Sequence, residues 1–273
     1  MGRPAIVGVI LAALAVGIGC QRAQTPDRGP ILQPQQWADI DMAAAPEVER
    51  QFGLPLDQPA VQAYVRTVGQ RVARAIASDE LAHHFIVLDS HVLTACALPS
   101  GEVYVTRGLL ERLNSEGELA ALLAHELAHL AARHTESLIG RSVSPAMLTE
   151  AAAAAAARNS GASVSRRAEA DLDKVVAAWL SVRYTPQMEA DADRLGLDCL
   201  VAAGYHPSQM IPLAELLALL QGSEAAEFLS VHPNPTDRVG RIREAVARKY
   251  AGRGGRVGEQ EYRREVLDRL AGR

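Results

Sequence analysis

The stretch from Leu119 to Leu130 most constrains this chain, because it places the pattern H-E-x-x-H inside an unbroken run of helix formers. An α-helix turns by about 100° per residue, so His125 and His129 lie about 40° apart on one face. Glu126 projects from the flank of that face. Leucines occupy roughly the opposite arc, which predicts that the other side of the helix packs against a core. The histidine face is therefore left for chemistry.

Two histidines in this spacing are what zinc takes from one helix, and Glu126 is placed to accept a proton from metal-bound water. The bare pattern also arises by chance in buried helices, so a third ligand has to be found. A metzincin is excluded, because Ala132 and Thr135 occupy the positions of its glycine and third histidine. His134 is one residue off and is predicted to lie on a continuing helix. A carboxylate from a later helix remains.

That later helix is predicted from Pro186 to about Ala203, and it carries Glu189 and Asp193 four residues apart on one face. Glu189 is the best candidate for the third ligand, which would give a site with two histidines, one glutamate and an open position. The same pair also fits a solvated helix face. Spacing alone leaves these two interpretations open.

The remaining periodicity predicts an α+β fold that is mostly α-helical. Aromatic residues make up only 4% of the chain while alanine and leucine abound, which favours helices. A helix is expected over Pro59–Ala77, and two strands, Phe85–Leu88 and Glu102–Thr106, are expected to form a small antiparallel sheet. The turn Leu98–Gly101 separates them. Just beyond, Ser115–Glu118 is a capping box that starts the histidine helix.

A helical hairpin is predicted as an insertion at about residues 140–182. Its first helix contains seven consecutive alanines within Met147–Arg158, and its second runs over Arg166–Val182. The alanine run suits close helix packing, with contact to a membrane surface as the alternative. A helix over Pro212–Leu220 and further helices make the C-terminal part helical.

The N-terminus carries the pattern of a bacterial lipoprotein signal peptide over residues 1–19. A positive Arg3 precedes an apolar segment that ends at Cys20, the predicted site of lipidation, although Gly17 replaces the usual leucine. An uncleaved membrane anchor and ordinary secretion are the alternatives. Gln21 stands where an inner-membrane retention aspartate would be, so the resemblance implies the outer membrane, on its periplasmic side.

Residues 20–36 are polar and rich in proline, which predicts a flexible tether, and residues 37–273 are expected to form a single domain. Cys96 and Cys199 would remain after lipidation, either as a disulfide or as buried thiols. A net charge of −4 gives no indication of a nucleic-acid partner. The oligomeric state is left open.

Several ordered motifs resemble the gluzincin zinc metallopeptidases of the HtpX and CAAX-prenyl-protease type, over about Glu47 to Ala247. The chain is most similar to the periplasmic lipoprotein branch that includes LoiP and BepA. One departure is Thr94, where the family usually has asparagine. The motifs are His125–His134, Glu189–Gly196, Ala95–Gly101, Thr106–Leu110, Ala203–Pro207 and His232-Pro233 with Arg238.

The resemblance implies one zinc ion held by His125, His129 and Glu189, with Glu126 as the catalytic base. Asp193 and Arg238 would lie behind these ligands, with Asp193 orienting a histidine. His232 would stabilise the tetrahedral intermediate or occupy the fourth zinc position in a resting state, although a role in capping the following helix is also open. The residues expected to offer a strand edge to the substrate are Glu102, Val103, Tyr104 and Val105.

The implied function is a zinc-dependent endopeptidase that cleaves unfolded or misfolded envelope proteins. Extended polypeptides would pair with the strand edge through main-chain hydrogen bonds. An outer-membrane protein assembly chaperone, which would use the zinc fold with little or latent proteolysis, is the alternative from another class. A purely structural zinc site is the third possibility, and it requires four ligands and no catalytic glutamate.

Overall fold

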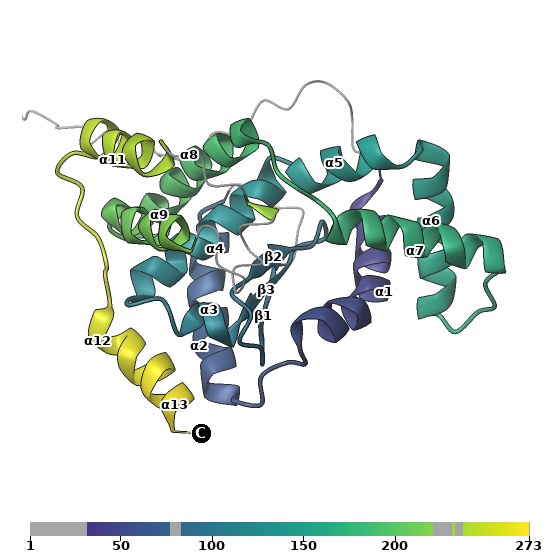
Figure 1. Cartoon of the computed structure of the whole chain (residues 1–273), viewed down its shortest axis with the longest axis horizontal. Coiled ribbons are helices and arrows are strands. Elements are labelled where there is room, and N and C mark those ends of the chain that lie inside the picture. Colours follow the sequence, from purple (N-terminus) through teal and green to yellow (C-terminus); the bar gives the residue numbers. More distant parts are fainter. Residues whose placement is uncertain (1–31, 77–82, 221–230, 233–236, 273) are drawn as a thin grey trace, which may run out of the picture.

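The computed structural model describes residues 32–76, 83–220, 231–232 and 237–272 (Figure 1). The predicted signal peptide, Cys20 and most of the predicted tether lie outside these residues. The tether prediction is wrong at its C-terminal end, because helix α1 begins at Pro34. Leu32 and Trp37 are already buried there, so the folded part starts slightly earlier than composition indicated.

Helices dominate the chain around one small sheet, as predicted. The helix over Pro59–Ala77 ends earlier than expected, and the alanine-rich hairpin forms close to its predicted bounds. The N-terminal half contains α1 (Pro34–Phe52), α2 (Pro59–Ala73), β1 (His84–Leu88), β2 (Ala95–Ala97), β3 (Glu102–Thr106), α3 (Arg107–Leu110) and α4 (Glu116–Ala131). The rest contains α5 (His134–Ser142), α6 (Pro145–Asn159), α7 (Arg166–Leu180), α8 (Pro186–Ala202), η1 (Pro207–Gln209), α9 (Met210–Leu219), α11 (Arg238–Lys249), α12 (Glu259–Tyr262), the π-helical η2 (Arg263–Leu267) and α13 (Asp268–Ala271).

The sheet has the order β1-β3-β2 and is mixed, so the prediction of an antiparallel sheet is only half right. β3 pairs with β1 in parallel and with β2 in antiparallel orientation. The chain reverses direction once into β2 and again into β3, which brings β3 back parallel to β1. β2 has only three residues, which is too short for a recognisable alternation, and this is why its part in the sheet was missed.

The prediction that Glu102–Val105 forms a sheet edge is wrong, because β3 is the central strand. Both sides of its backbone are already paired, so it has no free row of main-chain groups for a substrate. β2 is the edge strand next to α4, with Thr94 directly before it.

The two faces of the sheet pack into two hydrophobic cores. Phe85, Val87 and Val103 point toward the core that includes α2, α4 and α9, whereas Leu88 and Tyr104 point toward α1 and the helices α5 to α7. Figure 1 shows α1, α6 and α7 gathered at one side of the sheet and α9, α11 and α12 at the other. The sheet therefore separates the hairpin from the C-terminal helices.

The hairpin packs through its alanines, as expected. α6 lies against both α7 and α1, and Ala151, Ala152, Ala154 and Ala155 on its inner face are buried. Small side chains let helix backbones approach closely. None of the helices within the described ranges is both long and apolar enough to cross a bilayer.

Cys96 and Cys199 do not form a disulfide with each other. Cys96 packs at the edge of the core beside α1 and the hairpin, whereas Cys199 belongs to the other core. The sheet lies between these two environments. The sequence left a disulfide and two thiols open for these residues, and in the structure both are thiols.

Candidate metal centre

Helix α4 begins where the sequence predicts it, but its cap differs in one detail. The Ser115 side chain accepts a hydrogen bond from the Glu118 backbone N–H at 3.0 Å. The Glu118 carboxylate accepts from the N–H of Asn114, at 2.9 Å, and not from that of Ser115. Every residue from Glu116 to Leu130 is buried, so α4 is the central helix of the molecule and its register is fixed by packing on all sides.

Helix α8 lies along α4 and brings the predicted carboxylates to the histidines. Its N-cap Thr185 accepts from the Met188 backbone N–H, and Pro186 occupies the first turn. Gly196 faces α4, and a Cβ there would lie 3.4 Å from the backbone of Ala124 and 3.2 Å from Met210 Cε. The close packing of these two helices positions Glu189 directly over the histidine face.

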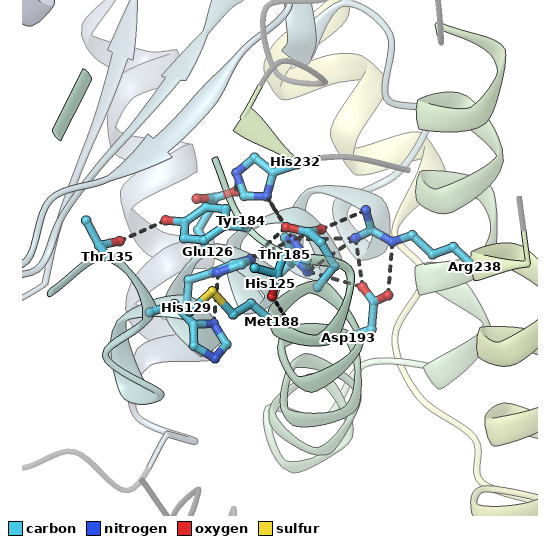
Figure 2. A network of polar contacts seen from close by, with 12 residues as sticks. His125, Glu126, His129, Thr135, Tyr184, Thr185, Met188, Asp193, His232 and Arg238 are labelled. Atoms are coloured by element: carbon cyan, nitrogen blue, oxygen red, sulfur yellow. Dashed lines mark hydrogen bonds and ion pairs between the residues drawn. The ribbon is translucent and has the colours of Figure 1, made fainter. Parts of the chain in front are cut away.

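Four buried side chains converge at this point: His125, His129, Glu189 and His232. One potential ligand atom from each lies within 4.8 Å of the other three. The Nε2 atoms of His125 and His129 are 3.2 Å apart, and each is 3.4 Å from a carboxylate oxygen of Glu189. His232 Nδ1 lies 3.0 Å from Glu189 Oε1 (Figure 2). Imidazole and carboxylate groups in such a cluster fit a transition-metal ion.

Glu126 lies beside the cluster and is fully buried. Neither of its carboxylate oxygens has a hydrogen-bond partner among the described residues, and His232 Nε2 is 3.6 Å from Oε1. A buried carboxylate without hydrogen bonds is unusual and suits a group that acts on water or substrate. Burial raises the pKa of Glu126, because the ionised form loses its hydration. A raised pKa brings a carboxylate closer to the working range of a general base.

Asp193 and Arg238 lie behind the cluster. Asp193 Oδ1 is 3.2 Å from His125 Nδ1, and the Arg238 guanidinium donates to both Asp193 oxygens at 2.7 and 2.9 Å. A second ion pair joins Arg238 Nη1 to Glu189 Oε2 at 3.0 Å. Figure 2 shows the guanidinium directed at Asp193. Arg238 thus ties α11 to α8 through two buried carboxylates.

The charges of the cluster shift the pKa values of its members. Burial opposes ionisation of Glu189, but His232, His125 and His129 outweigh it and hold its pKa below the usual range. At His129 burial is the largest cause and lowers the pKa, because the charged form of the imidazole loses its hydration. At His125 the carboxylates of Asp193 and Glu189 outweigh burial and raise the pKa to about 9. A cation bound here would therefore compete with a proton at His125.

Three residues around His129 were not predicted. The helix was expected to continue through His134, but α4 ends at Ala131 and His134 begins a new helix, α5. The His134 ring faces the His129 ring. Tyr184 stacks on His129 with ring centroids 3.8 Å apart, and its hydroxyl bonds Thr135 at 2.8 Å. In the sequence, only two positions indicated a role for these residues: His134 closely follows the H-E-x-x-H pattern, and Tyr184 directly precedes Thr185, the N-cap of α8.

The family assignment follows from residues 59–246, which match the model of peptidase family M48. The chain belongs to this family. It is 27% identical over 188 residues to the beta-barrel assembly-enhancing protease of Escherichia coli (strain K12), covering 67% of this chain and 38% of that protein. It is also 27% identical over 253 residues to the mitochondrial metalloendopeptidase OMA1 of Schizosaccharomyces pombe, covering 86% and 71%.

The match to the mitochondrial metalloendopeptidase OMA1 of Arabidopsis thaliana is 29% identical over 154 residues and covers 56% of this chain. The chain spans 29% of that protein's length and 38% of the Escherichia coli protease. The four residues of the metal cluster lie within residues 59–246, the part of the chain that matches the family model.

Proposed function

We propose that the chain is a zinc-dependent endopeptidase that cleaves unfolded or misfolded proteins of the bacterial cell envelope. The observation that carries this proposal is the buried cluster of His125, His129 and Glu189 beside Glu126, whose carboxylate has no hydrogen-bond partner in the described part of the chain. Two histidines and a glutamate are the donor set of many catalytic zinc sites. We further propose that the chain from α1 onward acts as a single metallopeptidase domain.

In this proposal the three ligands hold one zinc ion, which when bound supplies Lewis-acid activation of a water molecule and of the scissile carbonyl. Glu126 accepts the proton of the attacking water and delivers it to the leaving amine. Asp193 orients the His125 ring through its Nδ1 atom, and Arg238 holds Asp193 in place. Burial of all these groups keeps their electrostatic interactions strong.

Strand β2 replaces β3 as the proposed docking edge for the substrate. The Thr94 carbonyl accepts from Thr106 N–H and the Leu98 N–H donates to the Glu102 carbonyl, both in or next to β3. Successive residues of a strand direct their backbone groups to alternate sides, so those of Ala95 and Ala97 point away from β3. No partner for them is found within the described ranges. Ala95 and Ala97 are only 1% and 2% exposed, so this edge is buried in the structure and a substrate can pair with it only once it is uncovered. A free row of main-chain donors and acceptors binds extended chains and not folded ones, which favours unfolded substrates.

We propose that His232 holds the site in a latent state by occupying the fourth zinc position. Support comes from its Nδ1 atom, which lies 3.3 Å from His125 Nε2 and 3.0 Å from Glu189. Val231, the residue before His232, accepts a hydrogen bond from the Tyr184 N–H at 3.0 Å, which holds this part of the chain next to the cluster. Substitution of His232 by alanine is then expected to raise peptidase activity. The exposed His84→Ala variant is the matched control, and unchanged or reduced activity in His232→Ala contradicts latency.

The deciding experiment measures casein cleavage by the purified protein with and without a chelator, alongside Glu126→Gln. We expect both treatments to reduce turnover at least about 100-fold, because general-base catalysis contributes 10²–10⁴-fold. Restoring zinc should recover the chelated enzyme but not the variant. Equal activity in wild type and Glu126→Gln would rule out the peptidase proposal.

An assembly chaperone for outer-membrane proteins remains the second candidate, and the burial of every cluster residue favours it. A chaperone would suppress aggregation of an unfolded outer-membrane protein equally well in wild type and Glu126→Gln, without producing fragments. The beta-barrel assembly-enhancing name of the Escherichia coli relative is compatible with both candidates.

We infer that the protein is lipid-anchored through Cys20 on the periplasmic side of the outer membrane. The apolar segment that ends at Cys20 and the Escherichia coli relative support this location. Labelling with a palmitate analogue should mark the wild-type chain and not Cys20→Ser. A labelled Cys20→Ser variant would contradict lipidation at this residue.

A further inference from the structure

His134 meets the second ring nitrogen of His129. The two Nδ1 atoms are 3.1 Å apart, and both residues are buried. On a continuing helix His134 would point about 140° away from His129. Arg133 prevents this: its φ of 54° is the only positive value at a non-glycine residue in the described part of the chain. The strained turn at Arg133 therefore brings His134 back onto His129.

The two histidines of the H-E-x-x-H pattern are supported in different ways. His125 Nδ1 faces the carboxylate of Asp193, the common arrangement for a metal-bound histidine. His129 Nδ1 faces the imidazole of His134, and no carboxylate or carbonyl partner for it is found among the described residues. Tyr184 covers the His129 ring and is itself fixed by Thr135, the residue next to His134. The start of α5 thus holds His129 from two sides.

Proton positions follow from which nitrogen faces the cluster. His129 Nε2 points at His125 Nε2 and Glu189, so its lone pair is needed there and its proton must lie on Nδ1. A proton on His129 Nδ1 can only be donated to His134 Nδ1 as an acceptor. His134 then carries its own proton on Nε2.

We propose that His134 is a positioning residue that fixes the tautomer and orientation of His129 for metal binding. This inference rests on the proposed role of His129 as a zinc ligand. A neutral imidazole acceptor orients the ring without adding another carboxylate to a site that already holds those of Glu126, Glu189 and Asp193. The H-E-x-x-H-x-x-x-x-H stretch of this chain therefore contributes two ligands and one positioning histidine.

The test compares His134→Asn with His134→Phe. The Asn amide oxygen lies near the position of Nδ1 and can accept, whereas Phe fills the space without an acceptor. Zinc affinity, measured by competition with a chromophoric chelator, should fall about 10–100-fold in His134→Phe and stay within about threefold in His134→Asn. The visible absorption bands of the cobalt-substituted protein should shift only in His134→Phe. Binding by His134→Phe within about twofold of wild type would overturn the proposal, as would equal losses in both variants.

A second measurement needs no variant and remains available if both substitutions prevent folding. Long-range proton–nitrogen NMR of the zinc-loaded wild type should show His134 protonated at Nε2, and a proton on its Nδ1 would refute the inference. Zinc binding by His129→Ala separates the two levels of proposal. Undiminished binding there would refute the zinc site itself, whereas lost binding with an unaffected His134→Phe would refute only the positioning role.

Discussion

Removing the Arg238 guanidinium should destabilise the fold strongly, because it leaves two buried carboxylates without their cation. Arg238 is 1% exposed and contacts Asp193 through two nitrogens and Glu189 through the third. Two unit charges 4 Å apart interact by about 4 kcal/mol at an effective dielectric constant of 20. Breaking a buried pair by removing one partner typically costs about 3–5 kcal/mol. We therefore expect Arg238→Met to lower the free energy of unfolding by about 4 kcal/mol.

Urea denaturation of the chelator-treated protein measures this loss without a contribution from a bound cation. A double-mutant cycle with Asp193→Asn isolates the pair, and we expect a coupling energy of at least about 2 kcal/mol. Arg248→Met is the matched control on the same helix, since its ion pair with Glu244 is exposed, and its effect should stay within about 0.5 kcal/mol. Arg238→Met as stable as Arg248→Met, or a coupling energy below about 0.5 kcal/mol, would refute the reasoning.

Three further predictions concern the rest of the molecule. Burial raises the pKa of Asp41, which accepts a hydrogen bond from Ser100 N–H, to about 7; because the folded pKa lies above the unfolded one, its contribution is present below about pH 4 and is lost as the pH rises to 7. Relative to Asp41→Asn, the wild type should lose up to roughly 4 kcal/mol of stability over that range in urea titrations, and a constant difference would contradict this. Ala155→Leu, on the buried face of α6, should lower the free energy of unfolding by about 1–3 kcal/mol in the same assay, whereas the exposed Ala153→Leu should change it by less than about 0.5 kcal/mol. Equal effects of the two substitutions would argue against the packing of this face. Zinc at 100 times its dissociation constant should add about 2.7 kcal/mol, seen as a melting temperature that falls on chelation, and an unchanged melting temperature would count against a bound ion.

Local signals in the sequence were sufficient for most helices. The Ser115 cap and the leucine pattern located α4, and Pro186 located the start of α8. The hairpin was predicted within a few residues at each end from its alanine run and helical periodicity, and in the structure Ser144 and Ser165 cap its two helices. Such signals depend on neighbours three or four residues away, so a single sequence contains them.

The sheet was predicted less well, because strand pairing depends on residues far apart in the chain. Nothing local distinguishes parallel from antiparallel pairing of β1 and β3, and β2 is too short to be recognised. The substrate edge was therefore placed on the wrong strand. Helix α1 was missed for another reason: its hydrophobic face becomes evident only where it packs on α6 and Tyr104.

The sequence by itself determined that the three central residues of the proposed chemistry lie together, since the helix repeat alone brings His125, Glu126 and His129 onto neighbouring positions. The tertiary structure decided what joins them. Packing of α8 on α4 brings Glu189 within 3.4 Å of both histidines, and α11 adds Arg238 behind them. The tertiary structure also decided that His134 turns back onto His129. Arg133, a single residue in the left-handed conformation that no helical pattern predicts, follows α4 and redirects the chain.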